Sequence, residues 1–416
     1  MRGAATSSNR SRLLNIWRAL GTEQQAPPAS QSTSYLLRLL SAEGLALADH
    51  PASNVWSSEQ AQFHSAPHLH ARHNTRDDFW IPPDPSLSEL VFKASEPGED
   101  SKRQDHLATV KRRLPDAALE EVVAVVEAAA ASGLGDKELV DAACKELIGD
   151  GGELSPAQLM AASMAFAQVG HFSTDWKNIV SKQAQAKLGE FRPSLLAALV
   201  KAFGIAGYVD GTFYDMVSKY VEQNIRKLGP QHLAEIAFGA NAGGCVTASM
   251  QNSIEMVAPD YVKQADMRGL AFFMEAYTLV RCFDADISEQ AAIRCSNEMK
   301  GTDSGSLVRL MKALSKLGQD DAELFGRIAQ ELHERGVHLL SNQDLSSAVS
   351  IFSGLVIYNK DLINSIVQHI LEHPENFSQE LHPIQECCNN LGHYSSELSE
   401  AVEKYGDSST AGFQTA

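Results

Sequence analysis

Several features that define common protein classes are missing from this 416-residue sequence. No apolar run approaches the roughly eighteen residues that a spanning helix needs, so no transmembrane segment is expected. The glycine-rich stretches at 133–135 and 149–152 lack a preceding strand pattern and a Gly-Lys-Ser/Thr ending, which argues against a phosphate-binding loop. The six cysteines include no Cys-x-x-Cys pair, so we expect buried or idle thiols in a reducing compartment.

Basic residues are scarce relative to acidic ones. The chain has 35 Lys and Arg against 52 Asp and Glu, and this net charge of −17 is unfavourable for a protein that binds phosphates along its whole length. The distribution is uneven: residues 114–153 hold two bases and ten acids, 154–190 hold three and two, and 191–227 hold five and three. The middle of the chain is therefore its basic part.

A repeated pattern occupies most of the chain. The stretch MAFAQVGHF at 164–172 is followed 37 residues later by KAFGIAGYV at 201–209 and then by FGANAGGCV at 238–246. Three columns keep this register: Leu159, Leu196, Leu233, Leu270, Leu307 and, after one inserted residue, Leu345; Gly133, Gly170, Gly207, Gly244 and Gly318; and Pro156, Pro193 and Pro230. Agreement among independent columns at a period of this length indicates a solenoid or array.

Each column has a mechanical reason. Ser155-Pro156 places a capping hydroxyl before a proline at the first helical position, where the missing N–H is not needed. An apolar stripe follows, and the glycine then ends the helix in the left-handed conformation. A second stripe, from Trp176, makes the unit a hairpin that must stack on its neighbours to bury its apolar face. The predicted fold is all-α: an α-solenoid of about eight 37-residue helical hairpins over 114–405, preceded by a largely extended N-terminal segment.

Histidines do not indicate an active site. His171 follows the turn glycine in a column whose residue type changes from hairpin to hairpin, so we interpret it as a loop residue. The four histidines between residues 64 and 73 lie in a Ser- and Pro-rich tract without cysteine, and His369 and His373 have no evident third ligand. We therefore expect no catalytic residue, no metal site and no cofactor.

The N-terminal hundred residues differ from the repeats. Residues 1–33 open with four arginines, several serines, no acid before Glu23 and an amphipathic stripe, as in an organelle transit peptide or a basic tail. We predict import into the mitochondrial matrix, with a plastid as the alternative. Residues 34–113 are predicted to be a Pro-, Ser- and His-rich linker with short helices, and 406–416 a flexible tail.

A row of lysines provides the candidate binding site. Lys145, Lys182 and Lys219 occupy one column, and stacked hairpins would space their ammonium groups about 10 Å apart. Lys201 shares a first-helix column, predicted to be exposed, with Lys312. The candidate RNA-binding residues are Lys145, Lys177, Lys182, Lys187, Arg192, Lys201, Lys219, Arg226, Lys227 and Lys312. They would track a single-stranded RNA backbone, whereas the alternative reads them as ordinary solvated side chains without exposed aromatics for base stacking.

The repeat resembles a known family. The hairpin has proline at its start, Ala165-Phe166-Ala167 or Ala202-Phe203-Gly204 in its first helix and glycine at its turn. This pattern is similar to the heptatricopeptide repeats of apicomplexan and dinoflagellate-related organelle proteins, relatives of the algal octotricopeptide repeats, and matches best over 154–264. The resemblance implies a role in organelle RNA processing, RNA stability or assembly of mitoribosomes. Many members end in a RAP domain, which we do not expect after Tyr405.

Together these features favour a non-enzymatic mitochondrial helical-repeat scaffold associated with organelle RNA or the mitoribosome. It would contact RNA through its middle repeats and other proteins of a large assembly through its acidic ends. The alternative is a protein-binding accessory or structural subunit of a mitochondrial respiratory or ATP-synthase complex. A hydrolase or transferase is the least favoured class, because no catalytic constellation is present.

Overall fold

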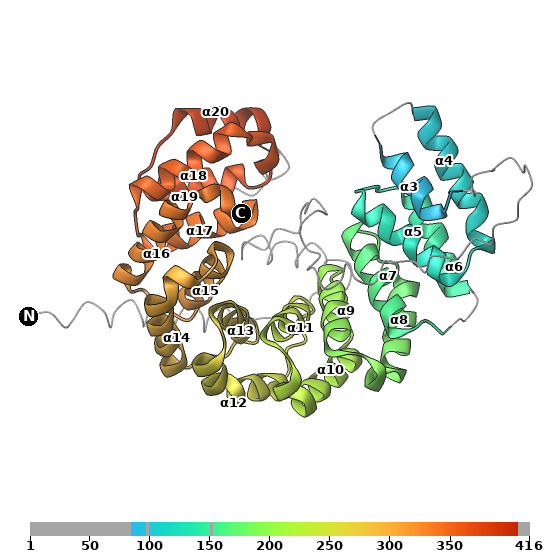
Figure 1. The fold of residues 1–416 in the computed structure, drawn as a ribbon, viewed down its shortest axis with the longest axis horizontal. Coiled ribbons are helices and arrows are strands. Elements are labelled where there is room, and N and C mark those ends of the chain that lie inside the picture. Colours follow the sequence, from blue (N-terminus) through green and yellow to red (C-terminus); the bar gives the residue numbers. More distant parts are fainter. Residues whose placement is uncertain (1–84, 97–99, 150–152, 407–416) are drawn as a thin grey trace, which may run out of the picture. The chain divides into compact units, whose positions relative to one another are not determined.

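The computed structural model describes residues 85–96, 100–149 and 153–406, and these ranges contain eighteen α-helices and no strand. The helices are α3 (Leu87–Ser95), α4 (Asp100–Arg113), α5 (Leu119–Ala131), α6 (Lys137–Gly149), α7 (Pro156–Gln168), α8 (Thr174–Ala186), α9 (Pro193–Ile205), α10 (Gly211–Asn224), α11 (Pro230–Ala242), α12 (Ala248–Gln264), α13 (Met267–Leu279), α14 (Ala285–Glu298), α15 (Ser304–Lys316), α16 (Ala322–Arg335), α17 (Asn342–Leu355), α18 (Lys360–Glu372), α19 (Leu381–Asn390) and α20 (Ser396–Tyr405). Successive helices form hairpins that follow one another along the chain (Figure 1). The predicted all-α solenoid is confirmed.

Eight hairpins run from α5/α6 to α19/α20, as the 37-residue period predicts. The leucine column forms their shared core, because no member is more than 1% exposed: Val122, Leu159, Leu196, Leu233, Leu270, Leu307, Leu345 and Leu381. A single cluster of buried residues extends from α3 to α20. Each hairpin thus buries its apolar face on its neighbours, which is how a solenoid obtains a continuous core.

One further hairpin precedes the predicted array. Helices α3 and α4 pack on each other, and α3 also packs on α5, with Leu87 and Val91 fully buried. The helical array therefore begins before the predicted boundary at residue 114. The sequence conceals this hairpin because α4 is rich in charged residues and buries only Leu107 and Val110.

The glycine column ends the first helices as predicted. Gly133, Gly170, Gly207, Gly244 and Gly318 all have φ between 59° and 82°, the left-handed region that glycine adopts without a steric penalty. Two hairpins place other residues there: Arg281 has φ 62° and Val356 has φ 56°. A β-branched residue is strained in this region, so the packing of the hairpin imposes the turn at Val356.

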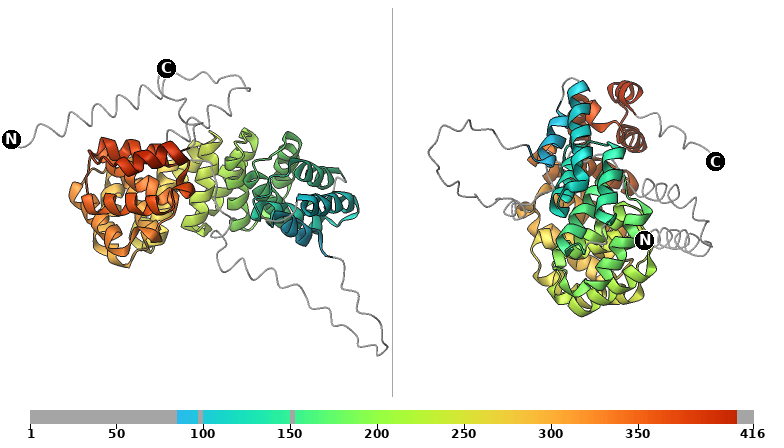
Figure 2. Two further views of the ribbon diagram at one scale, coloured as in Figure 1. Left: turned by 90° about the horizontal axis from the view of Figure 1, so that it is seen from above. Right: turned by 90° about the vertical axis from the view of Figure 1, so that its right-hand side faces the viewer.

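Odd-numbered helices form one layer of the solenoid and even-numbered helices form the other, as α7 to α15 show (Figures 1 and 2). Neighbouring odd helices pack together far more extensively than neighbouring even helices. The tightest approach joins α9 and α11, where a Cβ added to Gly239 would lie 2.2 Å from the Val200 carbonyl oxygen. A Cβ added to Gly204 would lie 2.7 Å from the Cα of Gly239. Only glycine permits this backbone contact.

Even helices are joined by hydrogen bonds between the N-cap residue of one helix and a serine in the middle of the preceding even helix. Ser181 of α8 donates a hydrogen bond to the carboxylate of Asp210, the N-cap residue of α10, at 2.5 Å. One hairpin later, Thr247, the N-cap residue of α12, donates to Ser218 of α10 at 2.8 Å. Both ties join residues 29 apart, so the same contact recurs from one hairpin to the next.

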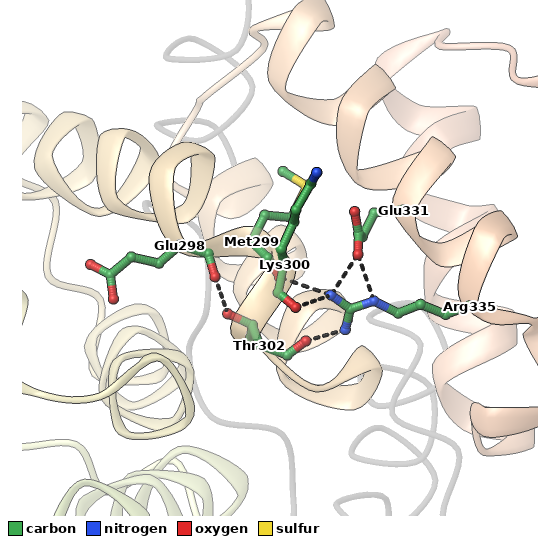
Figure 3. Close-up of polar contacts among 6 residues, drawn as sticks. All are labelled: Glu298, Met299, Lys300, Thr302, Glu331 and Arg335. Atoms are coloured by element: carbon green, nitrogen blue, oxygen red, sulfur yellow. Dashed lines mark hydrogen bonds and ion pairs between the residues drawn. The ribbon is translucent and has the colours of Figure 1, made fainter.

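The last turns of several even helices hold the preceding linker between hairpins. In Figure 3 the guanidinium of Arg335 donates to the main-chain carbonyls of Met299 (2.9 Å), Lys300 (3.1 Å) and Thr302, while Glu331 accepts from it at 2.7 Å. Other side chains that reach a preceding linker or helix end in this way include Lys187, Tyr261 and Arg294. Long polar side chains here therefore stabilise the stack and satisfy main-chain acceptors.

Candidate nucleic-acid interface

Three of the candidate lysines form an exposed column on even helices. Lys145 in α6, Lys182 in α8 and Lys219 in α10 occupy equivalent positions on successive hairpins. All three are exposed, and none forms an ion pair within the described ranges. We call these residues the lysine column. Its spacing follows directly from the 37-residue repeat, because equivalent positions on stacked helices point the same way.

Three more of the candidate bases lie where one hairpin passes to the next. Arg192 is the N-cap residue of α9, and Arg226 and Lys227 lie in the 3-10 helix Ile225–Lys227 between α10 and α11. All three side chains are exposed. Arg192 follows α8, which carries Lys182, and Arg226 and Lys227 follow α10, which carries Lys219. These five exposed cations therefore belong to two successive hairpins and the linkers that follow them.

Two candidates are engaged inside the fold. The ammonium group of Lys187 donates to the carbonyl of Leu154 at 2.9 Å and lies 3.6 Å from the carboxylate of Glu153, and only 15% of its side chain is exposed. The ammonium group of Lys177 lies 5.8 Å and 5.7 Å from the ring centres of Phe172 and Tyr208, and burial lowers its pKa. Neither side chain is available in the way the sequence suggested.

The remaining two candidates, Lys201 and Lys312, lie in the other layer. They belong to the odd helices α9 and α15, and both are half-buried rather than exposed as predicted. The odd helices approach closely, so a long side chain on one of them reaches the next and loses contact with water. The ten candidates therefore divide between two faces instead of forming one surface.

Charged residues on the odd helices are arranged in pairs. Lys201 of α9 lies 3.6 Å from the carboxylate of Glu235 on α11, and Glu275 of α13 pairs with Arg309 of α15. Both pairs join residues 34 apart on successive odd helices, so each joins two different columns, about one helical turn short of the 37-residue repeat. We call a pair of residues at these positions a rung.

Two further rungs, one between these ion pairs and one after them, do not contain an ion pair among the described residues. Phe238 and Phe272 occupy the rung between them, and both are half-buried. Lys312 and Ser347 occupy the rung after Glu275 and Arg309, at a spacing of 35 because α17 begins one residue later than the repeat requires. The face of the odd helices thus alternates between acidic, basic, aromatic and neutral positions.

An aromatic ring between two arginines is the feature that sequence reasoning missed. The guanidinium carbon of Arg309 lies 4.3 Å from the ring centre of Phe272, and that of Arg268 lies 5.9 Å from the same ring. Cations attract the face of an aromatic ring, most strongly where water is displaced. The spacing of 37 between Phe272 and Arg309 was a usable signal, because it places them in one column of neighbouring helices.

The lysine column continues as apolar residues. Met256 of α12 and Ile293 of α14 occupy the next two positions, and they are 60% and 53% exposed. Single exposed apolar residues are common on protein surfaces. Two of them at successive positions of one column lie on neighbouring even helices and form a continuous apolar stretch of the column. The even-helix face therefore changes from cationic to apolar between α10 and α12.

Side chains capable of catalysis or metal binding are dispersed. His171 lies in the turn after Gly170, at the loop position predicted for it, with Nε2 2.5 Å from a carboxylate oxygen of Asp141. The six cysteines are unpaired, and burial raises the pKa of Cys388 to about 11, which keeps its thiol protonated at neutral pH. Within the described ranges, no three His, Cys, Asp or Glu side chains gather as a metal site requires.

The N-terminal predictions, namely the transit peptide at 1–33 and the linker as far as residue 84, lie outside the described residues. Among the helices that the structure describes, none is both long and apolar enough to cross a membrane. A scan against protein-family models finds no match, and a search of curated proteins finds no similar sequence.

Proposed function

We propose that this protein is a non-enzymatic scaffold that binds single-stranded RNA along the lysine column of its even helices. The observation that carries the proposal is the ammonium groups of Lys182 and Lys219, which recur once per hairpin, are exposed, and have no ion-pair partner among the described residues. Arg192, Arg226 and Lys227 add exposed positive charge on the same two hairpins. The N-terminal sequence pattern and the family resemblance support organelle RNA or the mitoribosome as the setting.

The chemistry of this face supports contact with the RNA backbone rather than with bases. Solenoids that read RNA use one helical repeat per base, together with side chains that stack on or hydrogen-bond to that base. Here Phe166, Phe203 and Phe213 are buried in the core, and Phe172, Tyr208 and Tyr220 are half-buried, so no aromatic residue described on α7 to α10 is exposed. Ammonium groups act as point charges toward phosphates, so binding would tolerate many sequences and weaken with salt.

One observation favours the alternative of a protein-binding accessory subunit. Met256 and Ile293 extend the column as exposed apolar residues, and apolar surface at successive positions is typical of protein contacts. Both functions are compatible in a scaffold that holds RNA on its middle hairpins and a protein on the hairpins that follow.

The test uses the full chain and a fluorescently labelled 20-nucleotide poly-uridine RNA, with anisotropy measured from 50 to 300 mM KCl. The double variant Lys182→Glu and Lys219→Glu is expected to weaken binding at least tenfold at 50 mM KCl. It is also expected to reduce the slope of log affinity against log salt by about 1.4, which is two phosphate contacts on a single strand.

The matched control is Lys263→Glu with Lys360→Glu, because it changes the net charge equally at exposed lysines outside the column. This control should keep affinity and slope close to those of the parent. Equal losses in both double variants would reduce the interaction to general charge attraction and reject the column as a site. Absence of binding by the parent at 50 mM KCl would reject the RNA function.

A further inference from the structure

The rungs of the odd helices follow a rule that one of them breaks. Where a rung contains a charged residue on α9 or α13, the facing position on the next odd helix carries the opposite charge: Lys201 faces Glu235, and Glu275 faces Arg309. Half-buried charges need such partners because desolvation without pairing is costly. The rung that begins at Lys312 on α15 ends at Ser347 on α17, a residue without charge.

Lys312 consequently has no ion pair or side-chain hydrogen bond within the part of the chain that is described. It is nevertheless half-buried, in the layer where the other rung cations are paired. Burial lowers the pKa of its ammonium group, and the positive charges of Lys316 and Arg309 lower it further, while Glu275 and Asp344 act in the opposite direction. Among the described residues, this positive charge therefore has no paired counter-ion.

The surroundings select among possible anions. Arg309 already pairs with Glu275 and lies over Phe272, which leaves Lys312 and Lys316 as the cations that a ligand would meet. Glu275 and Asp344 are close enough to influence Lys312, so a chain of phosphates laid along this face would be repelled. A single carboxylate on a chain of mixed charge avoids that repulsion and matches the alternating rungs.

We infer that the odd-helix face from α13 to α17 binds a segment of mixed charge from a partner protein, and that Lys312 receives one carboxylate of this segment in the place that Glu235 and Glu275 occupy in other rungs. Charge complementarity supports this occupant: the missing group in the rung is a carboxylate, and carboxylates complete the rungs on either side of Phe238 and Phe272. This surface is separate from the lysine column, and the inference is independent of RNA binding.

The first experiment supplies the missing carboxylate within the chain. Ser347→Glu should complete the rung, and Ser347→Gln is the control of equal size without charge. Lysines of the full chain are reductively methylated with ¹³C, and the pKa of Lys312 is read from its NMR titration, assigned with Lys312→Arg. The pKa is expected to be higher in Ser347→Glu than in Ser347→Gln. Equal pKa values would show that position 347 does not face Lys312 and would overturn the inference.

The second experiment asks for the partner chemistry directly. An array of random 12-residue peptides, each containing one central Glu and accompanied by its Gln twin, is probed with the full chain and both Ser347 variants. We expect a set of peptides whose binding to the parent chain weakens at least tenfold when their central Glu is replaced by Gln. The same Glu-containing peptides should bind at least tenfold more weakly to Ser347→Glu than to the parent chain. Their binding to Ser347→Gln should be unchanged.

The outcomes separate this surface from the RNA site. The double variant Lys182→Glu and Lys219→Glu should bind the same peptides as the parent. The inference fails if no peptide depends on both its own Glu and position 347. It also fails if micromolar poly-uridine RNA displaces the peptides from the parent and Ser347→Glu lowers RNA affinity, because phosphate would then be the ligand of Lys312.

Discussion

The two layers of the solenoid carry charges at the same 37-residue period with opposite consequences. On the even helices, Lys182 and Lys219 are exposed and form no ion pair with any residue that the structure describes, whereas on the odd helices Lys201 and Arg309 are half-buried and paired. Odd helices pack against each other much more extensively than even helices. Charged side chains on closely packed helices contact one another and are stable only as ion pairs of opposite sign. Charged side chains on more widely separated helices are exposed to solvent and remain available to a ligand.

The largest effect is expected where the odd helices touch. Gly239→Ala would place a methyl group 2.2 Å from the Val200 carbonyl oxygen, so α9 and α11 must move apart. We expect a loss of about 3 kcal/mol in the free energy of unfolding, measured by urea denaturation. Gly211→Ala on the even helix α10 is the control, because nothing lies within 4 Å of its added Cβ. Equal effects of the two changes would contradict the difference between the layers.

A smaller effect is expected where the even helices are tied. Asp210 caps α10 and also accepts a hydrogen bond from Ser181 of α8, whereas Asp284 caps α14 and accepts from no side chain of the part of the chain that the structure describes. Asp210→Ala should lower the free energy of unfolding by about 2 kcal/mol, and Asp284→Ala by about 1 kcal/mol. If the two variants are equally stable, the tie between even helices contributes nothing measurable.

The same carboxylate predicts a dependence on pH. Burial alone would raise the pKa of Asp210, but hydrogen bonds from Ser181, the main chain of Phe213 and Tyr208 outweigh burial and hold the pKa below its ordinary value. Its contribution to stability is therefore complete above the unfolded-state pKa of about 4 and disappears as the pH falls through the lower folded-state value. The stability difference between the parent and Asp210→Ala should shrink in urea titrations below about pH 4.

Removing one charge of a rung should lower the free energy of unfolding less than Gly239→Ala or Asp210→Ala does. Arg309→Met removes the ion pair with Glu275 and the cation over Phe272, and we expect a loss of about 1 kcal/mol. Arg268→Met removes a cation that is farther from the same ring and forms no ion pair within residues 85–96, 100–149 and 153–406, so less than about 0.5 kcal/mol should be lost. A larger loss for Arg268 than for Arg309 would show that the rungs do not hold the odd layer together.

The smallest effect on stability is expected for the lysine column itself. Lys182→Met and Lys219→Met should change the free energy of unfolding by less than about 0.5 kcal/mol each, since both side chains are exposed and pair with no residue of the described ranges. Urea denaturation and RNA anisotropy on the same preparations provide the measurement. A destabilisation comparable to Arg309→Met would indicate that the column serves the fold rather than a ligand.

Much of the fold follows from local sequence signals. Pro156 starts a helix and Gly170 ends it, and the buried leucines recur at the distance that one hairpin requires. Part of the site follows as well, because residues 37 apart on exposed helix faces must line up, as Lys182 and Lys219 do. Hairpin α3/α4 did not follow, since α4 buries two apolar residues among many charges and has no clear periodic stripe.

The sequence by itself determined the repeat, its helices and turns, and the alignment of equivalent side chains, because these depend on spacing along one chain. Only the tertiary structure decided which of the aligned charged side chains are bound to a partner within the fold and which are exposed to solvent. The rung of Lys201 with Glu235 joins different columns, and the acceptor of Lys187 is a main-chain carbonyl, so neither partner is visible as a residue pattern. Both contacts depend on how closely neighbouring helices approach, and that distance is set by packing at positions such as Gly204 and Gly239.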